Sequence, residues 1–193
     1  MPILCNSGKH INKTREEPDM KGYIHIYCGD GKGKTTAALG LALRASGANK
    51  KVLLTRFMKT NSSSELSSLS LQPNITVIPT SKVFGYYYSL SDEEKEHAYD
   101  YYSSLLKEAC KKAIDENYDL LILDEVTYVY SYHFIDCDYL ISFLHIKPEQ
   151  LEVVLTGKHP APELLDMADY ISDIKKVRHP YDKGVLPREG IEL

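Results

Sequence analysis

The chain has 193 residues, 43% hydrophobic and 26% charged, a composition typical of a globular domain that builds its own core. Its net charge of −4 argues against a general nucleic-acid binder, which usually carries a basic excess. No apolar run reaches membrane-spanning length and the N-terminus lacks a secretion-signal pattern. We therefore expect a cytoplasmic protein that binds neither nucleic acid nor membranes.

The four cysteines are Cys5, Cys28, Cys110 and Cys137, and they lie far apart without the paired spacing of a zinc site. We expect reduced thiols that act as small, buried or neutral side chains. Residues 1–21 show little apolar periodicity and are predicted to be a loose N-terminal arm. Residues 22–193 then form one domain.

The first chemical landmark is a glycine-rich loop between a predicted strand, Tyr23–Cys28, and a predicted helix, Thr35–Ser46. This strand, loop and helix are the pattern of a P-loop, in which backbone amides and a helix N-terminus bind nucleotide phosphates. The residues expected to cradle ATP are Gly29, Asp30, Gly31, Lys32, Gly33, Lys34, Thr35 and Thr36.

Two residues of this loop are predicted to be catalytic. Lys34 would neutralise phosphate charge, and the hydroxyl of Thr35 would bind Mg²⁺. The loop is one residue shorter than the usual spacing, because Cys28 stands where a glycine is expected. A purely structural glycine-rich turn is the alternative interpretation.

The next segments alternate between strands and connections. Lys51–Met58 is predicted to be a buried strand, and Asn74–Pro79 a short one. Between them, Asn61–Ser70 is either a surface loop with one short helix or a border of the ligand crevice. The segment 81–89 is rich in aromatic residues, which could be core or could form the wall of an apolar pocket.

A capping box at Ser91 and Glu94 predicts the start of a long helix. Its apolar stripe is expected to pack in the core and consists of Ala98, Tyr102, Leu105, Ala109 and Ala113.

The second chemical landmark is the apolar strand Tyr118–Leu123, which ends in the acids Asp124 and Glu125. Beside a P-loop, this pattern predicts a carboxylate that holds Mg²⁺ directly or through water. The sequence does not decide which of the two acids binds the ion, and strand-end acids also serve as helix caps.

The remaining elements are predicted as a helix at Asp136–Leu144, a strand at Leu151–Leu155, a helix at Pro162–Ala168 and a strand at Tyr170–Val177. Strands that alternate with helices imply an α/β fold of the P-loop NTPase (RecA-like) type. Such a fold has a mostly parallel sheet with helices on both faces and one crevice at the carboxyl ends of its strands.

Several of these motifs together resemble the P-loop corrinoid adenosyltransferases. Gly29–Ala38 resembles their shortened P-loop, and Leu123–Tyr128 resembles their acidic strand. Leu155–Lys158 corresponds to their Leu-Thr-Gly-Arg, and the tail resembles their ending at His179–Gly184 and Gly190–Glu192. The similarity extends from about residue 22 to the C-terminus, with the motifs in the same order.

This resemblance implies an ATP:cob(I)alamin or cob(I)yrinic acid a,c-diamide adenosyltransferase of cobalamin biosynthesis or salvage. Such enzymes transfer the 5′-deoxyadenosyl group of ATP to the Co(I) centre of a reduced corrinoid and release triphosphate. The resemblance also implies Mg²⁺, an electron donor such as a flavoprotein, and a homodimer.

The same resemblance suggests corrinoid and nucleotide contacts outside the P-loop. Phe84 and Tyr86 stand where the family has a Phe-x-Trp element that keeps the lower face of cobalt free of an axial ligand. Lys158 replaces a family arginine, and Pro187–Arg188 replaces Ala-Gln. His179 is expected either to contact nucleotide or corrin or to be solvated in a basic tail.

Two other classes of protein remain open. One is a small-molecule kinase or NTPase that uses the same P-loop and Mg²⁺ site. The other is a nucleotide- or corrinoid-binding protein without turnover, which the replacements at positions 86, 158, 187 and 188 would favour.

Overall fold

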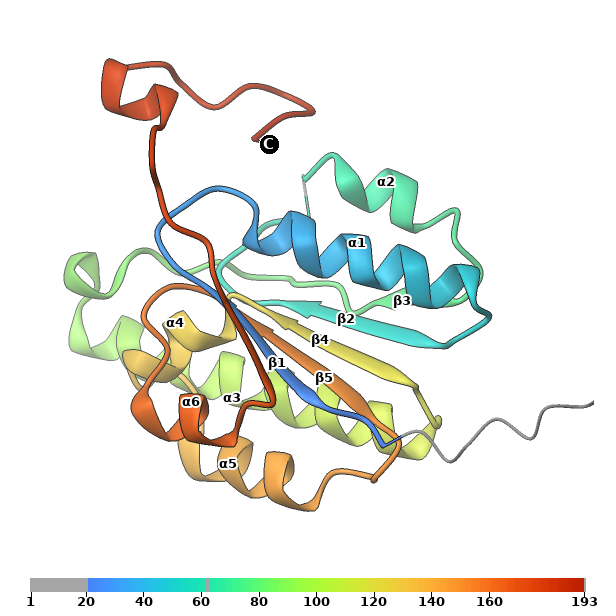
Figure 1. Ribbon diagram of the computed structural model, residues 1–193. Coiled ribbons are helices and arrows are strands. Elements are labelled where there is room, and N and C mark those ends of the chain that lie inside the picture. The colour runs from blue at the N-terminus through green and yellow to red at the C-terminus, as the bar shows by residue number, and fades with distance from the viewer. Residues whose placement is uncertain (1–20, 62, 193) are drawn as a thin grey trace, which may run out of the picture.

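The computed structural model describes residues 21–61 and 63–192, which build a six-stranded parallel sheet in the order β3-β2-β4-β5-β1-β6 (Figure 1). The strands are β1 (Ile24–Cys28), β2 (Val52–Arg56), β3 (Ile75–Val77), β4 (Leu120–Asp124), β5 (Glu152–Thr156) and β6 (Tyr170–Asp173). Each lies within or close to a predicted strand, so the parallel α/β fold is confirmed. The predicted N-terminal arm and Cys5 lie outside the described residues, apart from Lys21.

Helices cover both faces of the sheet (Figure 1). Helices α1 and α2 pack on one face, and α3, α4, α5 and α6 pack on the other. Their bounds are α1 (Lys34–Gly47), α2 (Glu65–Leu69), α3 (Asp92–Asp115), α4 (Val126–Ser131), α5 (Cys137–Ile146) and α6 (Pro162–Met167). Two short 3₁₀ turns also occur, one before α3 at Tyr87–Ser89 and one after β6 at Pro180–Lys183.

The central strands are apolar along nearly their whole length because both of their faces are covered. On β2, Leu53 packs towards α3 and Leu54 towards α1, and both are fully buried. On β4, Leu121 packs on the α3 side of the sheet and Ile122 on the α1 side. A strand buried on both faces has no polar alternation, which explains the uninterrupted apolar runs in the sequence.

The predicted start and buried face of the long helix are both confirmed. The backbone N–H of Glu94 donates to Ser91 Oγ at 3.2 Å, and the N–H of Ser91 donates to Glu94 Oε2 at 2.8 Å. These reciprocal bonds satisfy amides that the first turn leaves unpaired. All five residues of the predicted apolar stripe are buried.

Two elements differ from the prediction. Strand β6 ends at Asp173 rather than continuing to Val177, because Ile174 leaves the sheet to bond with the loop that follows β1. Helix α4 was not predicted, and it follows directly after the acidic end of β4. Both differences lie at the carboxyl edge of the sheet, where the loops gather (Figure 1).

The described cysteines are free thiols, with Cys28 and Cys110 buried and Cys137 half-buried. Burial raises the pKa of the Cys28 thiol, so this side chain stays neutral. None of the helices in the described part of the chain combines the length and apolar character needed to cross a bilayer.

Candidate active site

The loop between β1 and α1 leaves the start of the helix open. Gly33 occupies the N-cap position with φ of 124°, and no side chain of the described residues caps the helix there. A Cβ at Gly33 would meet nothing within 4 Å, although an L-residue would be strained at this φ. There is therefore space beside the N-cap of α1, and the unpaired amides and positive end of a helix bind phosphate in such a setting.

The two earlier glycines of the loop lie in close contact with the segment that follows β6. A Cβ at Gly29 would lie 2.5 Å from Asp173 Oδ1, and a Cβ at Gly31 would lie 2.6 Å from the Ile174 carbonyl oxygen. The Gly31 N–H donates to that carbonyl at 2.7 Å, and Asp30 Oδ1 accepts from the Lys176 N–H at 2.9 Å. These glycines let the segment after β6 lie directly against the loop.

Lys34 lies folded back over the loop. Its side chain is buried, with 8% of the residue exposed, and its Nζ donates to the Gly31 carbonyl at 2.9 Å. Burial lowers the pKa of Lys34, and the neighbouring Glu125 carboxylate opposes that shift. Lys32 and Thr36, also expected at the phosphate site, are exposed.

The acidic end of β4 lies against the start of α1. Asp124 is fully buried, and its Oδ1 accepts hydrogen bonds from Thr35 Oγ1 at 2.9 Å and Thr156 Oγ1 at 2.6 Å. Its Oδ2 accepts from Lys59 Nζ at 2.6 Å, and the same ammonium lies 2.6 Å from Thr35 Oγ1. The structure thus brings together Thr35 and Asp124, as expected for a metal site, and adds Lys59.

These donors fit Mg²⁺. A threonine hydroxyl and a carboxylate are the hard oxygen ligands that this ion prefers, and it usually takes few protein ligands alongside water and substrate phosphates. A cationic group, Lys59 Nζ, already lies between Thr35 and Asp124, so the position accepts positive charge. Among residues 21–61 and 63–192, no cluster of three or more His, Cys, Asp or Glu side chains offers another cation site.

Glu125 lies beside this cluster without a hydrogen bond to Thr35. It occupies the N-cap of α4 with a left-handed φ of 61°, and its N–H donates to Thr156 Oγ1 at 2.8 Å. Burial raises the pKa of the Glu125 carboxyl, and Asp124 raises it further. Lys59, Lys34 and Lys158 act in the opposite direction.

Glu125→Gln is expected to raise the free energy of unfolding of the nucleotide-free protein at pH 7. A carboxyl whose pKa is raised in the folded state favours folding below its ordinary pKa of 4.5 and loses that contribution as the pH rises through the folded value. Glutamine does not ionise, so the gain should be absent below pH 4.5 and grow above it. Urea unfolding at several pH values measures this difference.

The control for this prediction is Glu96→Gln, which alters an exposed carboxylate on α3. Its stability should stay within about 0.5 kcal/mol of wild type across the pH range. A Glu125→Gln variant that is less stable at pH 7 than at pH 4.5, relative to wild type, would contradict the prediction.

Part of the aromatic segment 81–89 packs on the core and part of it is exposed at the surface. The core interpretation therefore applies to some of its residues, and the others are free to form the wall of an apolar pocket. The Phe84 ring packs on the core against Tyr102, with centroids 5.5 Å apart, while Tyr86 is 74% exposed. Tyr87 stacks on Tyr132 of the α4 C-cap at 5.1 Å, and the Tyr86 ring meets Tyr128 of α4 at 6.4 Å. The result is an aromatic surface fixed to the core at the same edge of the sheet as the P-loop.

Lys158 follows the carboxyl end of β5, next to Gly157, whose φ is 141°. A Cβ at Gly157 would lie 2.3 Å from Thr127 Oγ1, so this turn fits closely against α4. Lys158 is exposed, and its charge acts on the pKa values of both Lys34 and Glu125. Its ammonium therefore acts electrostatically on the P-loop, and a contact of Lys158 with nucleotide stays a prediction.

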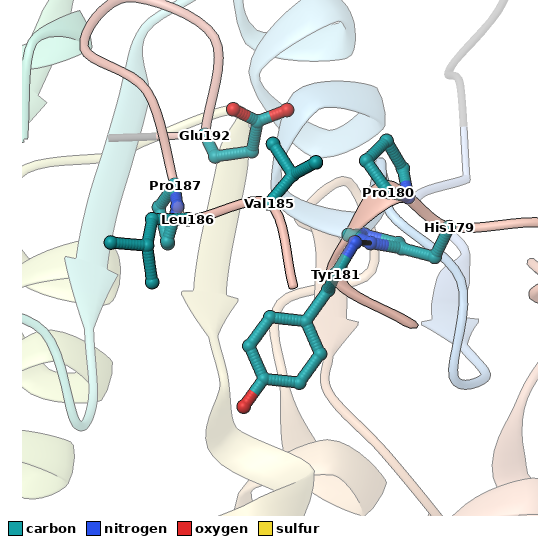
Figure 2. Close-up of a pocket in the computed structure, with 7 residues that line it drawn as sticks. All are labelled: His179, Pro180, Tyr181, Val185, Leu186, Pro187 and Glu192. Carbon is teal, nitrogen blue, oxygen red and sulfur yellow. Dashed lines mark hydrogen bonds between the residues drawn. The ribbon is translucent and has the colours of Figure 1, made fainter. Parts of the chain in front are cut away.

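His179 lies in the tail and not among the P-loop contacts. Its Nδ1 accepts from the Tyr181 N–H at 3.1 Å. It lines a small pocket, whose volume is about 30 Å³. Figure 2 shows the tail residues around this pocket: His179, Pro180, Tyr181, Val185, Leu186, Pro187 and Glu192. This pocket is far too small for a nucleotide or a corrin.

Arg188, also in the tail, pairs with Glu192, and its Nη2 donates to Glu192 Oε1 at 3.0 Å.

The sequence did not reveal that Lys59, the Thr156 hydroxyl and the tyrosines at 128 and 132 belong to the site. Lys59 and Thr156 lie at or just beyond the carboxyl ends of β2 and β5, which flank β4 in the sheet. In the sequence, the one feature that marks these two residues is their position at the end of an apolar strand. That position indicates a place in the site only once the strand order is known.

Comparison with known proteins identifies the family. The family model described as "ATP:corrinoid adenosyltransferase BtuR/CobO/CobP" matches residues 20–193. A corrinoid adenosyltransferase of Escherichia coli K12 is 31% identical over 93% of this chain and 90% of its own length. That of Salmonella typhimurium is 30% identical over the same shares.

Among solved structures, a KaiC-like protein of Pyrococcus horikoshii matches with a TM-score of 0.49 and 16% identity, over 79% of this chain and 73% of that one. The family match spans every described residue and contains both the P-loop and the acidic strand end. The chain belongs to the ATP:corrinoid adenosyltransferase family BtuR/CobO/CobP.

Proposed function

We propose that this chain transfers the 5′-deoxyadenosyl group of ATP to the Co(I) centre of a reduced corrinoid and releases triphosphate. The observation that carries the proposal is a cationic phosphate cradle beside an aromatic surface. Lys34 and the open N-terminus of α1 form the cradle, and the exposed Tyr86 ring together with the half-buried Tyr128 forms part of the aromatic surface. Both lie at the carboxyl edge of the sheet (Figure 1).

The chemistry requires a stabilised leaving group rather than a base. The electron pair of Co(I) forms a bond to C5′ of the ribose while the C5′–O bond breaks, and the triphosphate leaves with that bond's electrons. Lys34 and the α1 amides would stabilise the negative charge that grows on the leaving oxygens, and the burial of Lys34 over the loop supports this role. Mg²⁺ held by Thr35 Oγ1 and Asp124 would neutralise further phosphate charge.

The aromatic surface suits the apolar face of a corrin ring. Phe84 is fixed against Tyr102 of α3, so it can support the surface without moving. Tyr86 is the exposed member and stands in place of a tryptophan of the family. Its hydroxyl needs a hydrogen-bond partner when covered, and a corrin side-chain amide is chemically suited to provide one.

The cellular setting is proposed on similar grounds. Three free cysteines among the described residues support a reducing compartment such as the cytoplasm. Edge strand β6 exposes Tyr170 and Ile171, which supports a homodimer as a means of covering a sheet edge. Because Co(I) is strongly reducing, the substrate also requires an electron donor, for which a flavoprotein is chemically suited.

An anaerobic assay with chemically reduced corrinoid, ATP and Mg²⁺ tests the activity. Loss of the Co(I) absorbance, a light-sensitive product and an equivalent of triphosphate are the expected results. Release of ADP or orthophosphate would instead identify a kinase or NTPase. Tight binding of both ligands without either product would identify a binding protein.

A further inference from the structure

Lys59 occupies a position that neither the P-loop nor the acidic strand accounts for. Its Nζ lies 2.6 Å from Thr35 Oγ1 and 2.6 Å from Asp124 Oδ2, the same two side chains proposed to hold Mg²⁺. We propose that Lys59 is the resident cation of this site: its ammonium takes the place of the metal in the nucleotide-free protein and must withdraw before a divalent ion can enter.

The need for such a cation follows from the burial of Asp124. Its side chain is completely inaccessible to solvent, and an ionised carboxylate in that position is costly without a counter-charge. Two threonine hydroxyls donate to Oδ1, but Lys59 provides the only ammonium group that any described residue places on Oδ2. When no metal is present, Lys59 supplies that charge.

The backbone of Lys59 is held by a dedicated set of hydrogen bonds. Thr80, itself buried, donates from Oγ1 to the Lys59 carbonyl at 2.9 Å and to Asn61 Oδ1 at 3.0 Å. Asn61 Nδ2 donates in turn to the Thr80 carbonyl at 2.7 Å. Arg56, also buried, donates from Nη2 to the Thr60 carbonyl at 2.8 Å. These hydrogen bonds hold the backbone of residues 59–61 in place. The Lys59 side chain therefore starts from a fixed position from which its ammonium reaches Asp124.

The ammonium can also leave. The Lys59 side chain is 25% exposed, so its flexible stem has a route towards the crevice, whereas Asp124 is enclosed. Two cations cannot share one carboxylate oxygen and one hydroxyl at contact distance, because their repulsion is strong in a partly desolvated site. Metal and Lys59 therefore exclude each other. A divalent ion alone should bind weakly, while an ion that arrives with polyphosphate offers the displaced ammonium a new anionic partner.

Binding of Mn²⁺ to the nucleotide-free protein, followed by electron paramagnetic resonance of the free ion, tests this inference. Lys59→Met should bind Mn²⁺ at least about tenfold more tightly than wild type, since it removes the competing charge. Lys59→Arg keeps a cation and should remain close to wild type. Lys82→Met removes the same charge from an exposed side chain and should change the affinity less than about twofold.

Two further variants protect the test against local disruption. Adding Asp124→Asn to Lys59→Met should abolish the tightened binding, which places the Mn²⁺ at this carboxylate. If Lys59→Met does not fold, Thr80→Val serves instead, because it keeps Lys59 and both metal donors but removes the hydroxyl that holds the Lys59 carbonyl. Its Mn²⁺ affinity should rise by a factor of about three.

The inference rests on the metal site of the proposed function, but its readout needs neither ATP nor corrinoid. Unchanged Mn²⁺ affinity in Lys59→Met overturns it, even if the wild-type protein transfers adenosyl groups. Tightened binding that depends on Asp124 supports it, even if the adenosyl-transfer assay is negative. The two proposals can therefore fail separately.

Discussion

Replacement of Lys34 by alanine is expected to lower the rate of adenosyl transfer by about a hundred- to a thousandfold, the usual effect of removing one preorganised group that stabilises developing charge. Lys34 is buried over the phosphate loop, and among the described residues its ammonium donates a hydrogen bond to the Gly31 carbonyl alone. The fold should therefore survive. Anaerobic loss of Co(I) absorbance measures the rate, and circular dichroism with thermal unfolding checks the structure.

A matched control lies on the same helix. Arg44 is an exposed cation in the last turn of α1, and Arg44→Ala should leave the rate within about twofold of wild type. A folded Lys34→Ala variant that turns over at the wild-type rate would remove the P-loop from the mechanism and with it the proposed leaving-group stabilisation.

Asp124→Asn is expected to affect both activity and stability. The amide cannot neutralise Lys59, and its NH₂ group must face either that ammonium or the hydroxyls of Thr35 and Thr156, all of which donate to the native carboxylate. Because the substitution removes the charged acceptor of several hydrogen bonds in a buried position, the nucleotide-free protein should lose about 2 kcal/mol of stability. Adenosyl transfer should fall by about a hundredfold or more.

Urea unfolding and the anaerobic assay, both as a function of Mg²⁺ concentration, measure these effects. Asp100→Asn, an exposed substitution on α3, is the control and should match wild type in both assays. If Asp124→Asn retained the wild-type dependence on Mg²⁺, the metal would have to be assigned to Glu125 instead.

The parts of this fold that the sequence predicts are those encoded by short, local patterns. The glycine loop after β1, the capping box at Ser91 and the apolar strand before Asp124 each depend on neighbouring residues, and the structure contains all three elements. The parallel order of strands and helices then follows from their alternation along the chain.

Helix α4 could not be predicted in this way. Its sequence, Val126–Ser131, is rich in β-branched and aromatic residues, which favour strands when considered alone. Tertiary packing decides otherwise, because Val126, Val129 and Tyr130 are buried against the core on the α3 side of the sheet. The aromatic surface that α4 contributes to the candidate site was therefore not visible in the sequence.

The Lys59 contact was unpredictable for a different reason. Lys59 and Asp124 are 65 positions apart and meet because β2 and β4 are neighbours, with Arg56 paired to Asp124 across the two strands. The order of strands in a parallel sheet depends on which crossovers skip a neighbour, and no single segment encodes that choice. The sequence could identify the carboxylate of Asp124 but not the ammonium of Lys59 that pairs with it.

The position of β1 has a consequence for how the protein is made. Among the described strands β1 is synthesised first, but its only partners there are β5 and β6, the last two in sequence. During translation β1 must wait, unpaired, until more than a hundred further residues have left the ribosome. Pairings so distant in sequence form slowly, so the nucleotide-binding loop should be among the last parts of a nascent molecule to mature.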